Sequence, residues 1–480
     1  MTASLACVMG FLMLGGDPMQ PNAPLAPSDN AGAAYSFAGP GTPMFVGPPP
    51  APAVPDGPMI VPPGYMTPGA APAGQPDGVQ FFSFDELKAE MKKLSWTKGD
   101  YTITPYGILW ANLVEETGRT NPGNYPLYVA RPREDANSDC YIDARSTRLG
   151  FDVLGPQVPM LWGAQVGGKV EIDFQRQIDT ENKPSLLLRH AYVEVKDDDF
   201  RLLAGQTWDV ISPLNPGVLF YSVGWDGGNI GYRRPQFRAE RYLTVSDTVQ
   251  VIAQGSLNTC SPTDTSGTAT TYTAMSSSWP VLEGRIATRL GPRGDGLFPW
   301  EFGVSSHVGQ LTYDFHKSAA GPFNFTDIGA PRETWSLNTD IRVPITQRFG
   351  VQGELFMGQN LGPFLGGVGQ SVDVVSYTDS TGKVHYATGD GIRSRGGWVD
   401  AWYDWTPRLH THSGYSVDDP FNNDVTSGRV YNGFCFANVS YDLAAKFLVG
   451  FEYSHWKTLW VGPSAVANSD NYNFVVKLGF

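Results

Sequence analysis

The sequence has no run of about 18 apolar residues, so it contains no helical membrane span. This absence does not exclude a membrane β-barrel, because a barrel strand carries a much weaker hydropathy signal than a membrane helix. Charge is also scarce. Only 17% of residues are charged and the formal net charge is −13, which argues against a nucleic-acid partner held by a general basic surface.

Cysteine and histidine are few, and neither forms a recognisable site. The four cysteines are Cys7, Cys140, Cys260 and Cys435, without the spacing of metal ligands. We expect Cys140 and Cys260 on long loops at the same side, where they pair or stay free. No nucleophile elbow is present, so we expect no enzyme, no metal and no cofactor.

Glycine (55) and proline (38) are abundant, and the first hundred residues divide by composition. Residues 1–16 hold a short apolar run that we interpret as an export signal, the alternative being a start codon that truncates it. Residues 17–80 are rich in Pro, Gly and Ala and predict an uncharged linker without a core. Residues 81–98 predict a short periplasmic helix, with Ser83 and Glu86 as a capping box.

The C-terminus shows the clearest strand pattern. From Asn471 to Phe480 every second residue is apolar, beginning with Tyr472 and Phe474, while residues such as Asn473 and Lys477 lie between. A period of 2 gives a strand one apolar face. A closed barrel in a bilayer pairs both edges of this strand and places the apolar face against lipid.

The rest of the chain, residues 99–480, repeats this pattern and predicts an outer-membrane β-barrel. Short connections such as 197–199 and 346–347 alternate with long ones such as 210–234 and 359–394, which is typical of short periplasmic turns and long outer loops. The fold class is therefore all-β, a 16-stranded antiparallel transmembrane barrel. The predicted strands are 102–113, 143–154, 162–174, 187–196, 200–209, 235–245, 248–258, 280–290, 299–310, 335–345, 348–358, 395–405, 409–417, 429–441, 446–456 and 471–480.

One segment carries a family resemblance. It contains Leu-Arg-His-Ala-Tyr-Val at 188–193, Gly-Gln-Thr-Trp-Asp at 205–209 and Arg-Arg-Pro-Gln-Phe-Arg at 233–238. Upstream, 144–151 has the sequence Ala-Arg-Ser-Thr-Arg-Leu-Gly-Phe. These motifs resemble the DcaP-like outer-membrane porins over roughly residues 143–245, together with the C-terminal strand.

The resemblance implies a trimeric diffusion channel of sixteen strands that passes small organic anions, including dicarboxylates. It also implies that the third outer loop, here 210–234, folds inward to constrict the pore. The family's periplasmic helical segment corresponds here to a much shortened helix, and the Pro-rich linker departs from the family pattern.

Arginines cluster where this loop rejoins the barrel. An arginine in a narrow pore offers a planar donor fork to carboxylate or phosphate groups. The alternative is that these arginines pair with wall acids such as Glu240 or Glu283 and only hold the loop. The residues predicted at the constriction or on the lumen wall are Arg233, Arg234, Arg238, Arg148, Arg285 and Arg289.

Acidic residues on the inferred lumen faces oppose a general anion preference. They include Glu171, Glu283, Glu354, Asp400 and Glu452. We therefore expect a porin for small hydrophilic solutes, with weak anion preference set locally at an arginine-lined constriction. The alternative is a plugged structural or surface-binding barrel, which a lumen filled by residues 210–234 would favour. Expected partners are outer-membrane lipid, small solutes, two further copies in a homotrimer and the cell wall through the linker.

Overall fold

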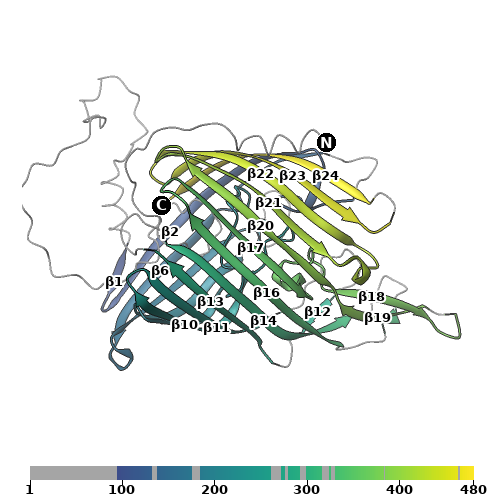
Figure 1. Cartoon of the computed structure of the whole chain (residues 1–480), viewed down its shortest axis with the longest axis horizontal. Coiled ribbons are helices and arrows are strands. Elements are labelled where there is room, and N and C mark those ends of the chain that lie inside the picture. The colour runs from purple at the N-terminus through teal and green to yellow at the C-terminus, as the bar shows by residue number, and fades with distance from the viewer. Residues whose placement is uncertain are drawn as a thin grey trace, which may run out of the picture.

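The computed structural model of the chain describes residues 95–131, 138–175, 184–260, 272–275, 279–291, 299–315, 324–325, 330–382, 384–462 and 465–480. Its main feature is a closed antiparallel barrel of sixteen strands, as the sequence predicted (Figure 1). The wall strands are β2 (Tyr101–Glu116), β6 (Arg148–Val158), β7 (Ala164–Asp173), β8 (Leu187–Lys196), β9 (Phe200–Trp208), β10 (Arg233–Ser246), β11 (Val249–Asn258), β13 (Val281–Leu290), β14 (Trp300–Phe315), β16 (Ala330–Pro344), β17 (Phe349–Gln359), β20 (Arg393–Asp404), β21 (Leu409–Pro420), β22 (Arg429–Ala444), β23 (Phe447–Trp460) and β24 (Val466–Gly479). No helix among these described residues is long and apolar enough to cross a membrane.

The barrel closes where the last strand meets the first. Strand β24 pairs with β23 on one side and with β2 on the other, so Phe474 lies opposite Leu113. Strand β2 continues to β6 and to the short β5 (Asp139–Asp143). Closure leaves neither strand with an unpaired edge, which removes the edge that would otherwise template aggregation.

The predicted alternation at the C-terminus is confirmed. Tyr472 and Phe474 expose 40% and 46% of their surface on the outside, while Asn473 and Lys477 expose 4% and 2% on the inside. The same alternation appears on β14, where Phe302 and Val304 face outward and Ser305 faces inward. A side-chain period of 2 on a closed sheet thus separates an apolar outer face from a polar lumen.

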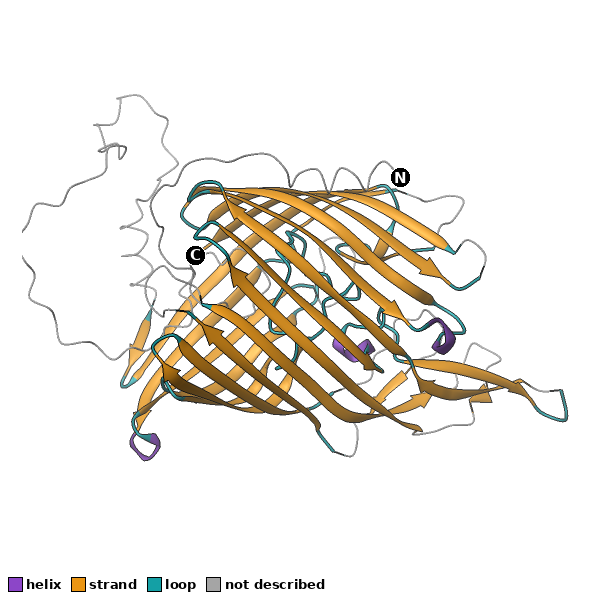
Figure 2. Ribbon diagram, in the orientation of Figure 1, coloured by secondary structure: helices purple, strands orange, loops and turns teal. Residues whose placement is uncertain are grey.

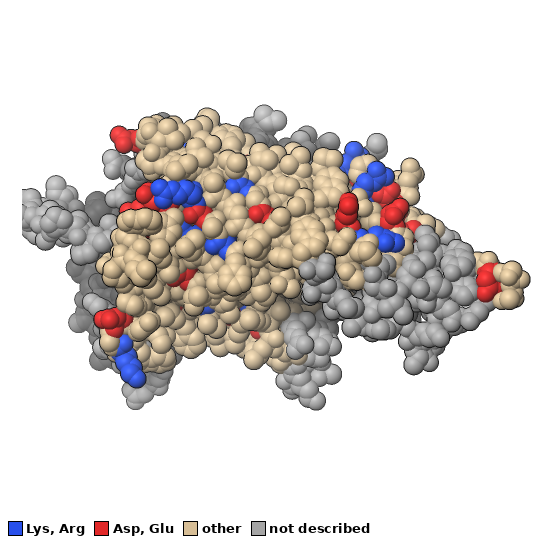
Figure 3. Space-filling view, turned by 90° about the horizontal axis from the view of Figure 1, so that it is seen from below, with Lys and Arg blue, Asp and Glu red and all other residues tan. Residues whose placement is uncertain are grey.

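The outer surface has a wide apolar band. Large exposed side chains such as Leu337, Leu355, Phe237 and Val399 lie on it, each from a different strand. In Figure 3 charged residues gather mainly toward the two ends of the visible face, and the surface between them is largely uncharged. This band is the lipid-facing surface of an integral membrane barrel.

The two ends of the barrel differ in the length of their connections. At the left of Figure 1, short turns such as 197–199 and 405–408 lie at the same end as the C-terminus. The opposite end carries the longer connections and small accessory elements. These are β12 (Tyr272–Met275), β15 (Asn324–Phe325), β18 (Val372–Thr378), β19 (Val384–Gly391) and η3 (Asn422–Asp424), whereas η1 (Pro159–Leu161) lies in a turn of the first end.

Predictions for the N-terminal region fall almost wholly outside the described residues. The export signal 1–16, the linker 17–80 and most of the helical segment 81–98 lie there. The end of that last segment differs from the prediction. Residues Trp96–Lys98 form strand β1, which pairs with β2 through Trp96 and Ile103, because the chain is already extended alongside the start of β2 at this point.

Cys140 and Cys260 do not pair. Both are free, with Cys140 exposed and Cys260 buried. Burial also raises the pKa of the Cys260 thiol to about 11, and its Sγ accepts a hydrogen bond from Arg234 Nη1 at 2.8 Å. Of the two alternatives for these cysteines, free thiols are the one observed.

Candidate functional site in the barrel lumen

Three connections fold back into the lumen and pack together. They are the hairpin of β3 (Thr120–Pro122) and β4 (Pro126–Val129), the loop 209–232 between β9 and β10, and the segment 360–371, which contains η2 (Gly362–Phe364). Figure 2 shows these teal loops and one short purple helix inside the ring of strands. We call these three segments the plug.

The plug has an apolar core of its own inside the barrel. Phe220 and Trp225 of the long loop pack with Tyr128 of β4 and with inward-facing wall residues such as Phe434 and Trp456. The rings of Phe434 and Trp456 stack at a centroid distance of 4.1 Å. Most of the loop 209–232 is buried. The loop therefore fills this level of the lumen rather than lining an opening in it.

Hydrogen bonds to backbone carbonyl oxygens join the three plug segments. Asp226 N donates to Leu365 O at 2.9 Å and Gly231 N donates to Phe364 O at 2.7 Å. Ser222 Oγ donates to Pro126 O at 2.5 Å, which joins the long loop to the hairpin. The three segments therefore form one packed body.

Carboxylates on six wall strands anchor the plug. Each accepts a hydrogen bond from a backbone N–H of the plug, and each side chain is at least 95% buried. The pairs are Thr120 N to Glu116 (2.8 Å), Val210 N to Glu283 (2.6 Å), Leu214 N to Glu354 (2.7 Å), Gly217 N to Asp400 (2.9 Å), Leu219 N to Glu452 (2.7 Å) and Val368 N to Asp418 (2.9 Å). A carboxyl oxygen that accepts a hydrogen bond from a backbone N–H holds that part of the loop at the wall, so these contacts fix the path of the loop.

The loop approaches the wall closely enough to require glycine. A Cβ built on Gly217 would lie 1.9 Å from His412 Nδ1 on β21. Gly228 has a φ of +130°, and a Cβ there would lie 2.6 Å from the carbonyl oxygen of Gly397 on β20. These two glycines let the backbone of the loop lie directly on the strands.

A further set of wall acids forms ion pairs with wall bases. Arg201 contacts both Glu194 (2.7 Å) and Glu240 (3.5 Å), and Arg238 contacts Glu240 (2.6 Å). On one side, Arg285 and Arg289 on β13 both pair with Glu301 on β14, and Arg285 also pairs with Asp340 on β16. On the other side, Lys196 on β8 pairs with Glu194, and Lys169 on β7 pairs with Asp152 on β6. We call these residues the ion-pair belt.

The belt faces the end of the lumen that carries the short turns. Lys196 is the last residue of β8, and Arg201 and Glu301 are the second residues of β9 and β14. Some of its members keep contact with solvent, with the Arg289 side chain 30% exposed and that of Asp152 24% exposed, whereas Arg285 and Asp340 are buried. Six cations and five carboxylates make up the belt, so its net charge is slightly positive.

The six predicted arginines divide between the belt and buried positions. Arg238, Arg285 and Arg289 belong to the belt. Arg234 is buried and donates from Nε and Nη2 to the Asp209 carboxylate at 2.6 and 2.8 Å, and from Nη2 to Pro363 O at 3.1 Å. Arg148 lies beneath the plug with its guanidinium 5.4 Å from the Trp110 ring centroid, and Arg233 is 4% exposed among aromatic rings. That any of them binds solute stays a prediction.

The sequence-based list omitted several lumen residues. Arg201, Lys169 and Lys196 belong to the belt, and Arg189 forms buried ion pairs with Glu171 and Asp173 at 2.5 and 2.7 Å. Strand alternation places Arg201, Lys169 and Lys196 in the lumen, and that signal could have found them. Arg189 faces the lumen only because of a bulge in β8, where the register shifts opposite Glu171 and Ile172. The anchoring role of Glu354 and its equivalents had no local signal, because the donors come from a distant loop.

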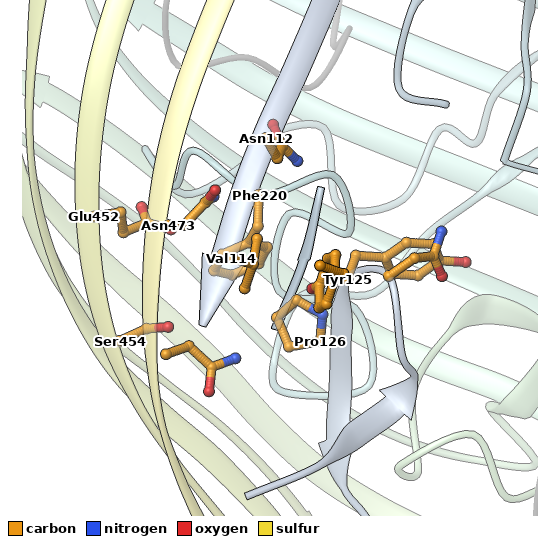
Figure 4. A pocket seen from close by; sticks show the side chains of 11 residues that line it. Asn112, Val114, Tyr125, Pro126, Phe220, Glu452, Ser454 and Asn473 are labelled. Atoms are coloured by element: carbon orange, nitrogen blue, oxygen red, sulfur yellow. The ribbon is translucent and has the colours of Figure 1, made fainter. Parts of the chain in front are cut away.

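A small cavity remains between the plug and the wall (Figure 4). Phe220 and Tyr125 of the plug face Asn473 and Ser454 of the wall across it. Neither side-chain polar atom of Asn473 has a hydrogen-bond partner among the described residues. The plug is therefore packed less completely against β23 and β24 here than at the carboxylate anchors.

One acidic residue of the plug is enclosed by the barrel. Asp226 is buried in the loop 209–232, and burial raises the pKa of its carboxyl group to about 7, partly opposed by the charge of Arg429. Asp418 on β21 lies close enough to raise it further. This carboxyl group therefore changes charge near neutral pH while it is enclosed.

Comparison with known proteins identifies the fold. No protein-family model matches the chain, and no curated protein matches its sequence. Among solved structures, the outer membrane channel DcaP of Acinetobacter baumannii is similar with a TM-score of 0.58 at 18% identity, covering 80% of this chain and 99% of that one. An anion-selective porin from Comamonas acidovorans has a TM-score of 0.47 at 11% identity, covering 79% and 100%.

The chain is thus a closed 16-stranded antiparallel β-barrel. Its fold is that of the DcaP channel, which confirms at the level of the fold the resemblance inferred from the sequence motifs.

Proposed function

We propose that the protein is an outer-membrane channel for passive diffusion of small hydrophilic solutes, with a weak preference for small organic anions such as dicarboxylates. The ion-pair belt is the observation that carries this proposal. It gives the lumen a polar, partly solvated wall in which cations outnumber carboxylates. The channel catalyses no reaction, and its copies assemble as trimers.

The positions of the acidic residues support the anion preference. Six wall carboxylates, including Glu283 on β13 and Glu452 on β23, accept hydrogen bonds from the plug and are buried. Such acids do not contact a passing solute directly. The solvated part of the lumen is then governed by the belt, where the local field decides selectivity.

A second function is favoured by the packed plug. Because the loop 209–232 fills the lumen at its level, the barrel also suits a closed structural role, with outer loops that bind a partner and the N-terminal linker tethering the envelope to the cell wall. For solute to pass, the plug must shift away from at least part of the wall.

Single-channel recording in a planar bilayer separates the two functions. The diffusion channel predicts stable open steps, and a salt gradient should give a reversal potential of the sign expected for weak anion preference. Folded protein without conductance would establish the structural role. Conductance with cation preference would keep the channel and remove the proposed role of the belt.

A further inference from the structure

The root of the loop 209–232 contains an arginine without a hydrogen-bonded partner. Arg233 is 4% exposed, and its Nε, Nη1 and Nη2 atoms have no hydrogen-bond partner among the described residues. Its guanidinium carbon lies 4.7 Å from the Trp208 ring centroid, 5.0 Å from that of Tyr232 and 5.7 Å from that of Trp225. Ring faces offset part of the cost of burying a cation, but they do not accept its hydrogen bonds as an anion does.

Two neighbouring tryptophans also have donors without a hydrogen-bond acceptor. The indole Nε1 atoms of Trp208 and Trp225 are buried and also have no acceptor within the described part of the chain, and their ring centroids are 6.0 Å apart. Indole and guanidinium groups are donors only. The cluster therefore gathers five buried donor nitrogens and supplies no acceptor for them, which is unusual in a folded protein.

The cations around Arg233 outnumber the carboxylates by one. Arg148, Arg189 and Arg233 lie near two carboxylates, Glu171 and Asp173. Arg189 binds both carboxylates directly, at 2.5 and 2.7 Å.

The carboxylate that interacts electrostatically with Arg233 is already occupied. Asp173 accepts hydrogen bonds from Arg189, from the Tyr221 hydroxyl at 2.7 Å and from Gln175 N at 3.0 Å. None of the guanidinium nitrogens of Arg233 forms a hydrogen bond with it. A buried cation in excess among donor groups is the chemistry of an anion site.

We infer that Arg233, Trp208 and Trp225 bind a small inorganic anion of chloride size. A monatomic anion matches this chemistry because all three side chains offer N–H donors and the donor nitrogens are buried. The bound anion fastens the loop 209–232 to strands β9 and β10, and it stabilises the plug whether or not the barrel conducts. The site is separate from the ion-pair belt, so this inference does not depend on the proposed function.

Bromide provides a direct test on crystals of the whole protein. Crystals grown with sodium bromide should show an anomalous peak in contact with Arg233 and the two indole rings. A structure in which bromide contacts only the solvent-exposed belt, or none of these residues, would overturn the inference.

Thermal unfolding of the purified barrel tests the same site in solution. At constant ionic strength, the unfolding temperature should be higher in sodium chloride or bromide than in sodium gluconate. Arg233→Met should abolish this difference, while the matched belt variant Arg238→Met should keep it. If Arg233→Met does not fold, Trp225→Phe removes one donor with little change in shape and should reduce the difference. A halide effect that is absent from the native protein, or equal in all variants, would refute the site.

Discussion

The carboxylate of Glu354 on β17 accepts a hydrogen bond of 2.7 Å from the backbone N–H of Leu214 in the plug. It also accepts one from Trp398 Nε1 on β20 at 3.2 Å. One buried acid thus joins two wall strands to the loop that fills the lumen. The equivalent contacts of Glu283, Asp400 and Glu452 extend this arrangement around the barrel.

Glu354→Leu should loosen the plug. It leaves the buried N–H of Leu214 without an acceptor, which costs about 1–3 kcal/mol in docking of the loop. We expect more frequent or longer open steps in bilayer recordings and faster hydrogen exchange of the backbone amides in residues 209–232. Glu354→Gln retains an acceptor oxygen and should have a smaller effect.

Glu115→Gln is the matched control for the anchor, because Glu115 is an exposed residue of β2. It should leave both conductance and exchange unchanged. If Glu354→Leu behaves like this control, the wall carboxylate does not hold the loop in place.

Arg234 and Arg238 should respond differently to substitution. Arg234→Met leaves the buried Asp209 without its ion-pair partner, so we expect a loss of about 3–5 kcal/mol in stability. Arg238→Met removes one belt cation and should shift the reversal potential toward cations with a smaller loss of stability, because Arg201 still pairs with Glu240. Thermal unfolding and bilayer recording of both variants measure the contrast. An unchanged reversal potential in Arg238→Met would exclude the belt as the source of anion preference.

Phe451→Arg tests the lipid-facing side of β23. Phe451 is 45% exposed on the outer face, so a charge there should cost about 2–4 kcal/mol near the bilayer midplane. Leu443→Arg lies at the end of β22 with the short turns and should cost only about 0–1 kcal/mol. Denaturant titration of barrels refolded in lipid vesicles compares the two. Equal costs would mean that the membrane lies at a different height on the barrel.

Docking of the plug should depend on pH through Asp226. Burial raises the pKa of this carboxyl group to about 7 in the docked loop, and in a released loop surrounded by water the pKa returns to its usual value near 4. The docked form therefore binds a proton more tightly, so docking is strongest at low pH and weakens as pH rises toward and through 7.

Limited proteolysis of the loop 209–232 at pH 5 and pH 8 measures this dependence. The native protein should be cleaved faster at pH 8, after correction for the protease's own pH profile. Asp226→Asn mimics the protonated form and should reduce the dependence, although Arg429 and Asp418 still face the position. A native protein that is equally protected at both pH values would contradict the prediction.

The wall of the barrel could be predicted from the sequence because its signal is local. Alternation of Tyr472 and Phe474 with Asn473 and Lys477 assigns each side chain to one face, and neighbouring strands repeat the pattern. The alternation of short and long connections fixes the order of strands in an antiparallel barrel. The inward fold of the third long loop followed from the resemblance to DcaP-like porins.

The state of the lumen could not be predicted in this way. The sequence places Glu354 and Arg234 on the inner side, but each meets a partner in the plug loop, the Leu214 backbone N–H and the Asp209 carboxylate. Whether an inward-facing acid or base meets solute or a loop depends on how three remote segments pack. Local side-chain periodicity therefore determines the barrel, and only the tertiary structure decides that its lumen holds a packed plug, because the contacts that hold the plug join residues up to several hundred positions apart.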